Sequence, residues 1–235
     1  MVQRCAGNFR AGLVWSGVIG SFLLFGWMGP AQAKDDLQYW NTLEMVKRLN
    51  SQWDLFFRPE MRMEDGATHL FYHEYRQGAR FKPSKNLEIG FNYLFVRNEN
   101  AGGKTLEEHT GEIDVTPKCT LGPFDLSLRS RVELRTIERS AGEQEYRIRL
   151  MPKIAYPTSI FHHKVTPYVA DDLFYDYTRD AWNQNRAFLG VVVPFKESHG
   201  VRTSMDFYYM NQALLGKRHD WSANHILGTK LNVQF

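Results

Sequence analysis

The sequence has few of the features that define several common protein classes. It contains only two cysteines, Cys5 and Cys119, which excludes a fold held together by several disulfides. Basic residues exceed acidic residues by only three, which argues against a nucleic-acid-binding protein. Repeated apolar runs of about 20 residues are absent, and this excludes a bundle of transmembrane helices. With 43% hydrophobic and 14% aromatic residues, the chain is not a disordered one.

The first 33 residues have the pattern of an export signal. Arg4 and Arg10 precede an apolar run from about residue 11, and Ala31-Gln32-Ala33 supplies a cleavage site. An uncleaved anchor helix is the alternative, but the Gly-Pro pair before this site argues against it. We therefore expect a signal peptide at 1–33 and a mature domain at 34–235. The mature domain would contain one thiol and no disulfide.

The mature chain alternates between apolar and charged residues with a period of two. From Trp53 to Glu64, the odd positions are apolar and five of the six even positions are charged. The alternation recurs at 124–135 and 146–154. A period of two indicates β-strands with one apolar and one polar face, and no segment has the period of an amphipathic helix. The chain is predicted to be a single all-β domain.

Eleven strands are expected from this pattern and from the turn-forming residues between them. They are 38–48, 51–64, 67–82, 87–97, 107–117, 124–138, 145–155, 165–177, 185–195, 201–212 and 222–235. Longer and shorter connections alternate along the chain. The longer ones lie near 98–106, 139–144, 178–184 and 213–221, and the shorter ones lie at 49–51, 83–86, 118–123 and 196–200. Bacterial barrels have even strand numbers. We therefore expect either that a segment such as 67–82 or 165–177 breaks in two, or that 38–48 forms no wall strand.

Several features favour a membrane barrel over a soluble sandwich. Strands of about 11 residues, tilted by about 40°, span roughly 28 Å, close to the apolar band of about 25 Å in outer-membrane barrels. Aromatic residues gather toward strand ends, as in interfacial girdles. Leu231, Val233 and the terminal Phe235 resemble the signal read by the barrel-assembly machinery. We predict an antiparallel transmembrane β-barrel of ten to twelve strands in the bacterial outer membrane, with a soluble lipocalin-like binder as an alternative.

Short motifs in the mature chain resemble a bacterial family. They are Asp171-Asp172-Leu173-Phe174-Tyr175, Asn183-Gln184-Asn185-Arg186, Gly190, Asn211-Gln212 and Asn224-His225, together with Trp40, Glu60 and Arg62. The chain resembles, over nearly all of 38–235, an uncharacterised domain-of-unknown-function family of Gram-negative outer-membrane β-barrel proteins. The resemblance implies a barrel fold and an outer-membrane location. It implies no activity.

If the apolar faces meet lipid, the charged faces line the lumen. The predicted lumen charge cluster comprises Arg58, Glu60, Arg62, Glu112, Asp114, Arg129, Arg131, Glu133, Arg135, Arg147 and Arg149. The arginines of 124–138 and 145–155 are expected close together, with acidic residues between them. Two functions remain open at this point: ion pairs that fill the lumen structurally, or a narrow path for small solutes that favours anions.

The sequence offers little catalytic chemistry. Asp171 and Asp172 cannot share a proton because adjacent strand residues point to opposite faces. His162-His163 is expected in a turn at the opposite rim from His225. The sequence has no G-x-S-x-G or H-E-x-x-H motif and no cysteine pair in its mature part. We expect no cofactor or metal, and an outer-membrane enzyme acting on lipid or lipopolysaccharide is the alternative function.

A second group of polar residues is expected at the outer rim, where neighbouring strands begin. It consists of Asn185, Arg186, Asn224 and His225, which either fix loop entry or bind lipopolysaccharide phosphate or sugar. The expected partners are outer-membrane lipid, lipopolysaccharide and, during biogenesis, the barrel-assembly machinery. We expect a monomer that binds no nucleic acid.

Overall fold

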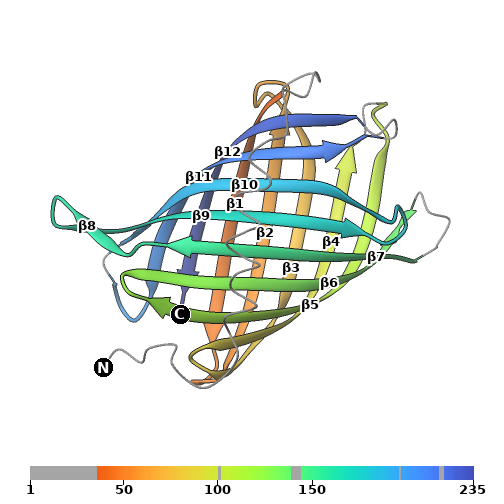
Figure 1. Ribbon diagram of the computed structural model, residues 1–235. Helices are drawn as coiled ribbons and strands as arrows, with labels where there is room; N and C mark the ends of the chain where they lie inside the picture. The colour runs from red at the N-terminus through yellow and green to blue at the C-terminus, as the bar shows by residue number, and fades with distance from the viewer. Residues whose placement is uncertain (1–35, 100–101, 139–143, 196, 217–219) are drawn as a thin grey trace.

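In a computed structural model, the chain is described over residues 36–99, 102–138, 144–195, 197–216 and 220–235, and these form a β-barrel (Figure 1). The predicted signal peptide lies outside these residues. The long strands are β1 (Asp36–Arg48), β2 (Trp53–Glu64), β3 (His69–Ser84), β4 (Leu87–Glu99), β5 (Thr105–Leu121), β6 (Phe124–Ile137), β7 (Gln144–Ala155), β9 (His163–Asp176), β10 (Ala181–Pro194), β11 (Arg202–Leu215) and β12 (Trp221–Gln234). The short β8 (Thr158–Ile160) pairs only with the start of β9. The described residues contain no helix long and apolar enough to cross a membrane.

Eleven strands close the ring in the order β1 to β7 and then β9 to β12. Neighbours are antiparallel except β12 and β1, which run parallel, with Asp36 opposite Asn224 and Val46 opposite Gln234. The prediction of an all-β barrel of ten to twelve strands is confirmed. The expectation of an even strand number is wrong. A ring of antiparallel neighbours needs an even number, but a parallel closing pair accommodates an odd one, so β1 is a wall strand and neither β3 nor β9 is divided.

The wall has a charged inner face and an apolar outer face. Arg131 and Glu133 point inward and are only 2% and 0% exposed, whereas Val132 between them is 53% exposed. The same arrangement holds in β2, where Asp54 is buried and Leu55 is exposed. The alternation read from the sequence therefore separates two environments with opposite polarity.

Part of the interior is apolar as well. Trp40, Met210 and Ile226 form a buried cluster on β1, β11 and β12, and Phe188 and Tyr208 pack against it. Trp40 and Tyr208 are two of the aromatic residues whose positions along the sequence resemble interfacial girdles, but the structure places both inside. They lie inside because Trp40 shares the inward parity of its strand, and Tyr208 packs on the inner cluster.

Two tyrosine rings occupy space left by glycines on neighbouring strands. A Cβ atom on Gly190 would lie 2.6 Å from Cζ of Tyr168, and a Cβ atom on Gly228 would collide with the ring of Tyr208. The glycines therefore let these two rings lie against the inner wall.

The connections form two groups at opposite rims. The rim that carries Phe235 also carries the β1–β2, β3–β4, β5–β6 and β10–β11 connections, as the antiparallel order requires. The difference in connection length is smaller than expected. The β9–β10 connection consists only of residues 177–180, while β8 extends the β7–β9 connection beyond the Phe235 rim (Figure 1).

Candidate functional site in the barrel interior

Strand register places the interior charges at matching heights. Asp114 on β5 is opposite Arg131 on β6, but Glu112 is opposite Glu133, and Arg131 is opposite Arg149 on β7. Like charges directly opposite each other are unfavourable. The long side chains therefore also form diagonal ion pairs, which join several strands into one network.

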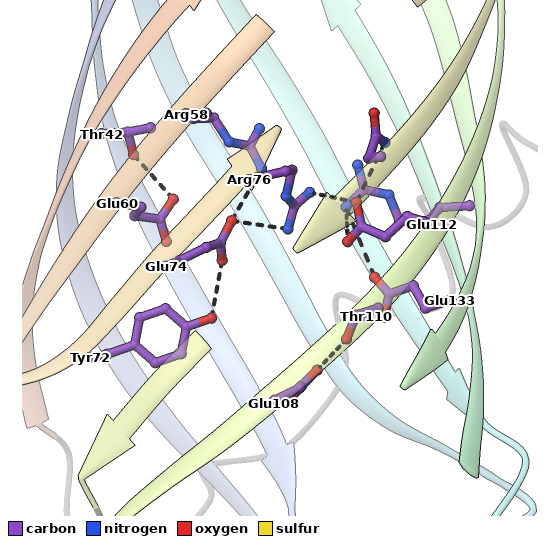
Figure 2. A network of polar contacts seen from close by, with 12 residues as sticks. Thr42, Arg58, Glu60, Tyr72, Glu74, Arg76, Glu108, Thr110, Glu112 and Glu133 are labelled. Atoms are coloured by element: carbon purple, nitrogen blue, oxygen red, sulfur yellow. Dashed lines mark hydrogen bonds and ion pairs between the residues drawn. The ribbon is translucent and has the colours of Figure 1, made fainter. Parts of the chain in front are cut away.

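Glu74 on β3 is the centre of one part of this network (Figure 2). Its carboxylate pairs with Arg58 at 3.4 Å and with Arg76 at 3.0 Å, and it accepts a hydrogen bond of 3.0 Å from Tyr72. Arg76 also reaches Glu112 on β5, at 3.3 Å. One buried carboxylate thus connects β2, β3 and β5.

Arg131 and Glu133 on β6 are the centre of a second part. Arg131 donates two parallel hydrogen bonds to Asp114, at 2.5 and 2.9 Å, and a third to Glu112, at 3.0 Å. Glu133 accepts from Arg149 at 3.0 Å. Bidentate guanidinium–carboxylate bonds fix geometry as well as charge, so this part of the interior is rigidly arranged.

Asp172 on β9 extends the network to the other side of the barrel. It accepts from Arg149 and pairs with Arg129 at 3.3 Å. Both guanidinium groups therefore share one carboxylate. Asp172 is itself only 2% exposed, so the carboxylate that these two arginines share is buried.

A cavity of about 510 Å³ remains in the middle of this interior. Its lining includes the side chains of Trp40, Arg62, Glu74, Arg129, Lys153, Tyr168, Asp172, Phe174 and Arg186. Polar atoms of many of these residues face the cavity, so it can hold water or a small polar solute.

Three cations on the cavity wall are not fully matched by carboxylates of the described residues. Lys153 forms no ion pair there, and its Nζ lies 3.7 Å from the centre of the Tyr168 ring. Arg186 also lacks an ion pair within the described chain and lies 5.0 Å from the centre of the Trp40 ring. Nε of Arg129 is buried without a hydrogen-bond partner in that part of the chain. The cavity wall therefore carries excess positive charge.

All eleven residues predicted for the lumen charge cluster point into the barrel. The sequence-based cluster omits other interior charges, including Glu44, Asp54, Glu74, Arg76, Glu108, Glu145, Lys153, Asp172, Arg186, Asp206 and Lys230. Glu74 and Arg76 occupy alternate, inward-facing positions of β3, so a period-two pattern could identify them from the sequence. The mixed run of aromatic and polar residues at the start of β3 obscures that parity.

The residues predicted for the outer rim do not form one group. Asn185 and His225 point outward, Arg186 points into the cavity, and Asn224 has the inward parity of Ile226. The prediction that their strands are neighbours is wrong, because β11 lies between β10 and β12. The strand expected at 201–212 already separates 185–195 from 222–235 along the chain, and the ring keeps this sequential order.

The residues proposed as an assembly signal lie at the closing seam. Leu231 and Val233 occupy outward positions of β12, and the Phe235 N–H donates to the Val46 carbonyl at 3.0 Å. Their recognition by the assembly machinery stays a prediction.

Candidate catalytic and metal-binding residues are dispersed. Asp171 points outward and Asp172 inward, as adjacent strand positions require. His163 begins β9 at the rim opposite His225. Ligand atoms of Glu64, Asp65 and His69 lie within 4.8 Å of one another at the β2–β3 turn and can hold a divalent cation. This group is mostly exposed, a common arrangement without any ion.

Together these features define a closed β-barrel with an ion-paired interior. Residues 37–223 match the family described as "Protein of unknown function (DUF2490)", and the chain belongs to this family. The resemblance to a family of unknown function is therefore confirmed. No curated protein matches the chain.

Proposed function

We propose that the protein is an integral barrel of the bacterial outer membrane. The observation that carries this proposal is the polarity of the wall, with buried Glu133 and Arg131 inside and exposed Val132, Ile113 and Leu189 outside. Apolar area in contact with water costs about 25 cal/mol per Å², whereas contact with lipid removes that cost. An outward apolar face and a polar interior are the reverse of a soluble β-protein.

The strand lengths support the same proposal. Each of β9 to β12 has 14 residues. At roughly 3.3 Å per residue and a tilt of about 40°, such a strand spans about 35 Å. This covers an apolar band of about 25 Å with polar margins at both rims. The predicted signal peptide provides a route to the envelope, with the Phe235 rim on the periplasmic side.

We propose that the lumen serves envelope structure or the limited passage of small solutes. Barrels of about 8 strands are filled by side chains, and those of 16 or more contain open channels. Eleven strands fall between these sizes, and the ion-pair network leaves a cavity of only about 510 Å³. Excess positive charge from Arg129, Lys153 and Arg186 makes small anions the preferred solutes of such a path.

Membrane location is tested by cell fractionation and gel electrophoresis. The protein is expected in the outer membrane, and its gel migration should change on heating because a closed barrel resists unfolding by detergent. Recovery as a soluble periplasmic monomer would contradict the proposal.

Planar-bilayer recording tests the lumen. A combined Arg129→Gln, Lys153→Gln and Arg186→Gln variant should lose preference for anions, and Arg97→Gln, which removes an outward charge, should keep it. Measurable conductance with unchanged preference in the triple variant would show that these residues do not line the path. Absence of conductance in any salt would assign the barrel a structural role.

An enzyme acting on lipid or lipopolysaccharide is the second candidate function. It is favoured by polar residues on the outer wall, where Asn185 donates to Asp171 and His225 is bonded to Tyr209. Lipid profiling of a deletion strain separates the two functions. An enzyme changes acyl or phosphate composition, and a structural barrel or pore leaves both unchanged.

A further inference from the structure

The outer wall carries two equivalent Tyr–His pairs. The Tyr209 hydroxyl lies 2.6 Å from Nδ1 of His225, and the Tyr93 hydroxyl lies 2.6 Å from Nδ1 of His109. In both pairs the residues are 16 positions apart and lie on consecutive strands. Each histidine is four positions beyond the first residue of its strand, at the rim opposite Phe235. The pairs therefore sit at the same depth on two sides of the barrel.

The tyrosine of each pair lines an apolar groove on the outer wall. The groove beside Tyr209 has a volume of about 570 Å³, and its lining includes Leu189, Val191, Phe207, Leu227 and the glycines 190 and 228. The groove beside Tyr93 has a volume of about 600 Å³, and its lining includes Phe91, Ile113, Val132, Leu134 and the glycines 78 and 111. Of these glycines only Gly111 has an outward position, where a Cβ atom would meet nothing within 4 Å, so it alone leaves room in the outer groove, whereas Gly78, Gly190 and Gly228 have inward parity. Both grooves run from a Tyr–His pair toward the middle of the wall.

The first pair is part of a longer polar row. His225 is opposite Asn211, Asn211 is opposite Ala187, and Ala187 is opposite Asp171. Asn185, two residues before Ala187 and at the next outward position of β10, donates to Asp171. Polar and ionisable groups on a lipid-facing wall are costly unless they have partners, and they commonly mark functional sites.

The depth of the row corresponds to the polar linkages of membrane lipids. Four residues at roughly 2.5 Å of height each place His225 about 10 Å from the rim. A wall about 35 Å high and an apolar band of about 25 Å leave a margin of about 5 Å at each rim. The row thus lies about 5 Å inside the band, where headgroups give way to acyl chains.

We propose that each Tyr–His pair and its groove bind one lipid of the outer leaflet. This inference rests on the proposed membrane location. The ester or amide linkage of the lipid contacts the pair, and the adjoining acyl chain lies in the groove. When Nδ1 accepts a hydrogen bond from the tyrosine hydroxyl, the neutral imidazole carries its proton on Nε2. That Nε2–H faces outward and donates to the carbonyl oxygen of the linkage.

The row beside His225 determines which lipid binds there. Asp171 accepts hydrogen bonds, and the Asn211 amide both donates and accepts. An amide-linked hydroxyacyl chain supplies the matching N–H and O–H donors and a carbonyl acceptor. Phospholipid esters supply only acceptors at this depth. The site on β9 to β12 is therefore assigned to the acylated sugar that anchors lipopolysaccharide.

Native mass spectrometry of the full barrel in mild detergent tests this assignment, with purified lipid A and phosphatidylethanolamine as probes. Wild type should retain two lipid A molecules at saturation. Loss of one hydrogen bond in His225→Phe should weaken binding at one site by about tenfold, and the combined His109→Phe and His225→Phe variant should weaken both. His73→Phe is the matched control, because His73 faces outward on β3 and has no tyrosine partner among the described residues.

Undiminished lipid A binding by the double variant would overturn the proposal, and so would equal weakening by His73→Phe. Equal binding of phosphatidylethanolamine at the His225 site would overturn the assignment to an amide-linked lipid. A dimer that dissociates in Asp171→Asn would show that the polar row joins two copies of the chain instead. Failure of the membrane proposal is distinguishable, because the protein would then fractionate with soluble periplasmic proteins before any lipid is added.

Discussion

Arg131 and Asp114 form a two-pronged ion pair across β5 and β6, through Nε and Nη2 of the guanidinium and both carboxylate oxygens. The pair is buried in the barrel, and the third donor of Arg131 binds Glu112. Two carboxylates thus share one guanidinium, and Glu112 also pairs with Arg76.

Arg131→Met should destabilise the barrel by about 3–5 kcal/mol, because it leaves Glu112 and Asp114 buried without their main partner. Urea unfolding of refolded protein in lipid vesicles measures this difference. Arg202→Met is the control. It removes an exposed pair with Glu197 at the rim, where ion pairs contribute about 0–1 kcal/mol. Equal effects of the two substitutions would contradict the importance of the interior network.

Val132→Arg tests which medium the outer wall contacts. Val132 lies near the middle of β6 and is half exposed. Arginine there should lower the unfolding free energy by about 2–4 kcal/mol if the wall faces lipid. If the wall faces water, the unfolding free energy should change by less than about 0.5 kcal/mol. Leu121→Arg at the rim should cost only about 0–1 kcal/mol. The unfolding free energy of both variants decides the matter, and a neutral Val132→Arg would refute lipid contact.

Gly228→Ala should destabilise the barrel by about 1–3 kcal/mol, because the added methyl group collides with the Tyr208 ring and forces a shift in a packed interior. Gly111→Ala is the matched control, since a Cβ atom there meets no atom within 4 Å. The combined Gly228→Ala and Tyr208→Ala variant should show the coupling in a double-mutant cycle. Additive effects would mean that the two residues do not pack against each other.

Phe235→Ala separates a targeting role from a structural one. The substitution keeps the backbone hydrogen bond to Val46 and removes the ring, which lies 5.2 Å from Nζ of Lys47. We expect the amount of protein in the outer membrane to fall severalfold. The unfolding free energy of refolded protein should change by less than about 1 kcal/mol. Unchanged outer-membrane levels would remove Phe235 from the proposed assembly signal.

The direction of individual side chains could be predicted from sequence because it depends only on parity within a strand. Arg131 and Val132 illustrate this, as do Asp171 and Asp172, which were predicted to diverge and do. Parity holds over a few residues and needs no knowledge of distant strands.

Contacts between strands that are not neighbours could not be predicted. Arg76 on β3 reaches Glu112 on β5, and Arg80 on β3 reaches Glu44 on β1. Such contacts require a curved wall that brings second neighbours within reach of an arginine side chain. The pairs Tyr93–His109 and Tyr209–His225 lie at outward positions, where the alternation predicts only lipid-facing side chains and gives no signal for a polar pair.

The parallel pairing of β1 with β12 has a consequence for engineering the chain. Asp36 is level with Asn224, while the Phe235 carbonyl accepts from the N–H of Arg48 at the far end of β1. In a ring closed by antiparallel strands, the first and last wall residues are neighbours at one rim and a short linker can fuse them. Here a linker from Phe235 to Asp36 must run the full height of the wall, about 35 Å. Circular permutation through a short linker is therefore sterically forbidden, and reporter groups attached at Asp36 and at Phe235 face opposite compartments if the wall crosses a membrane.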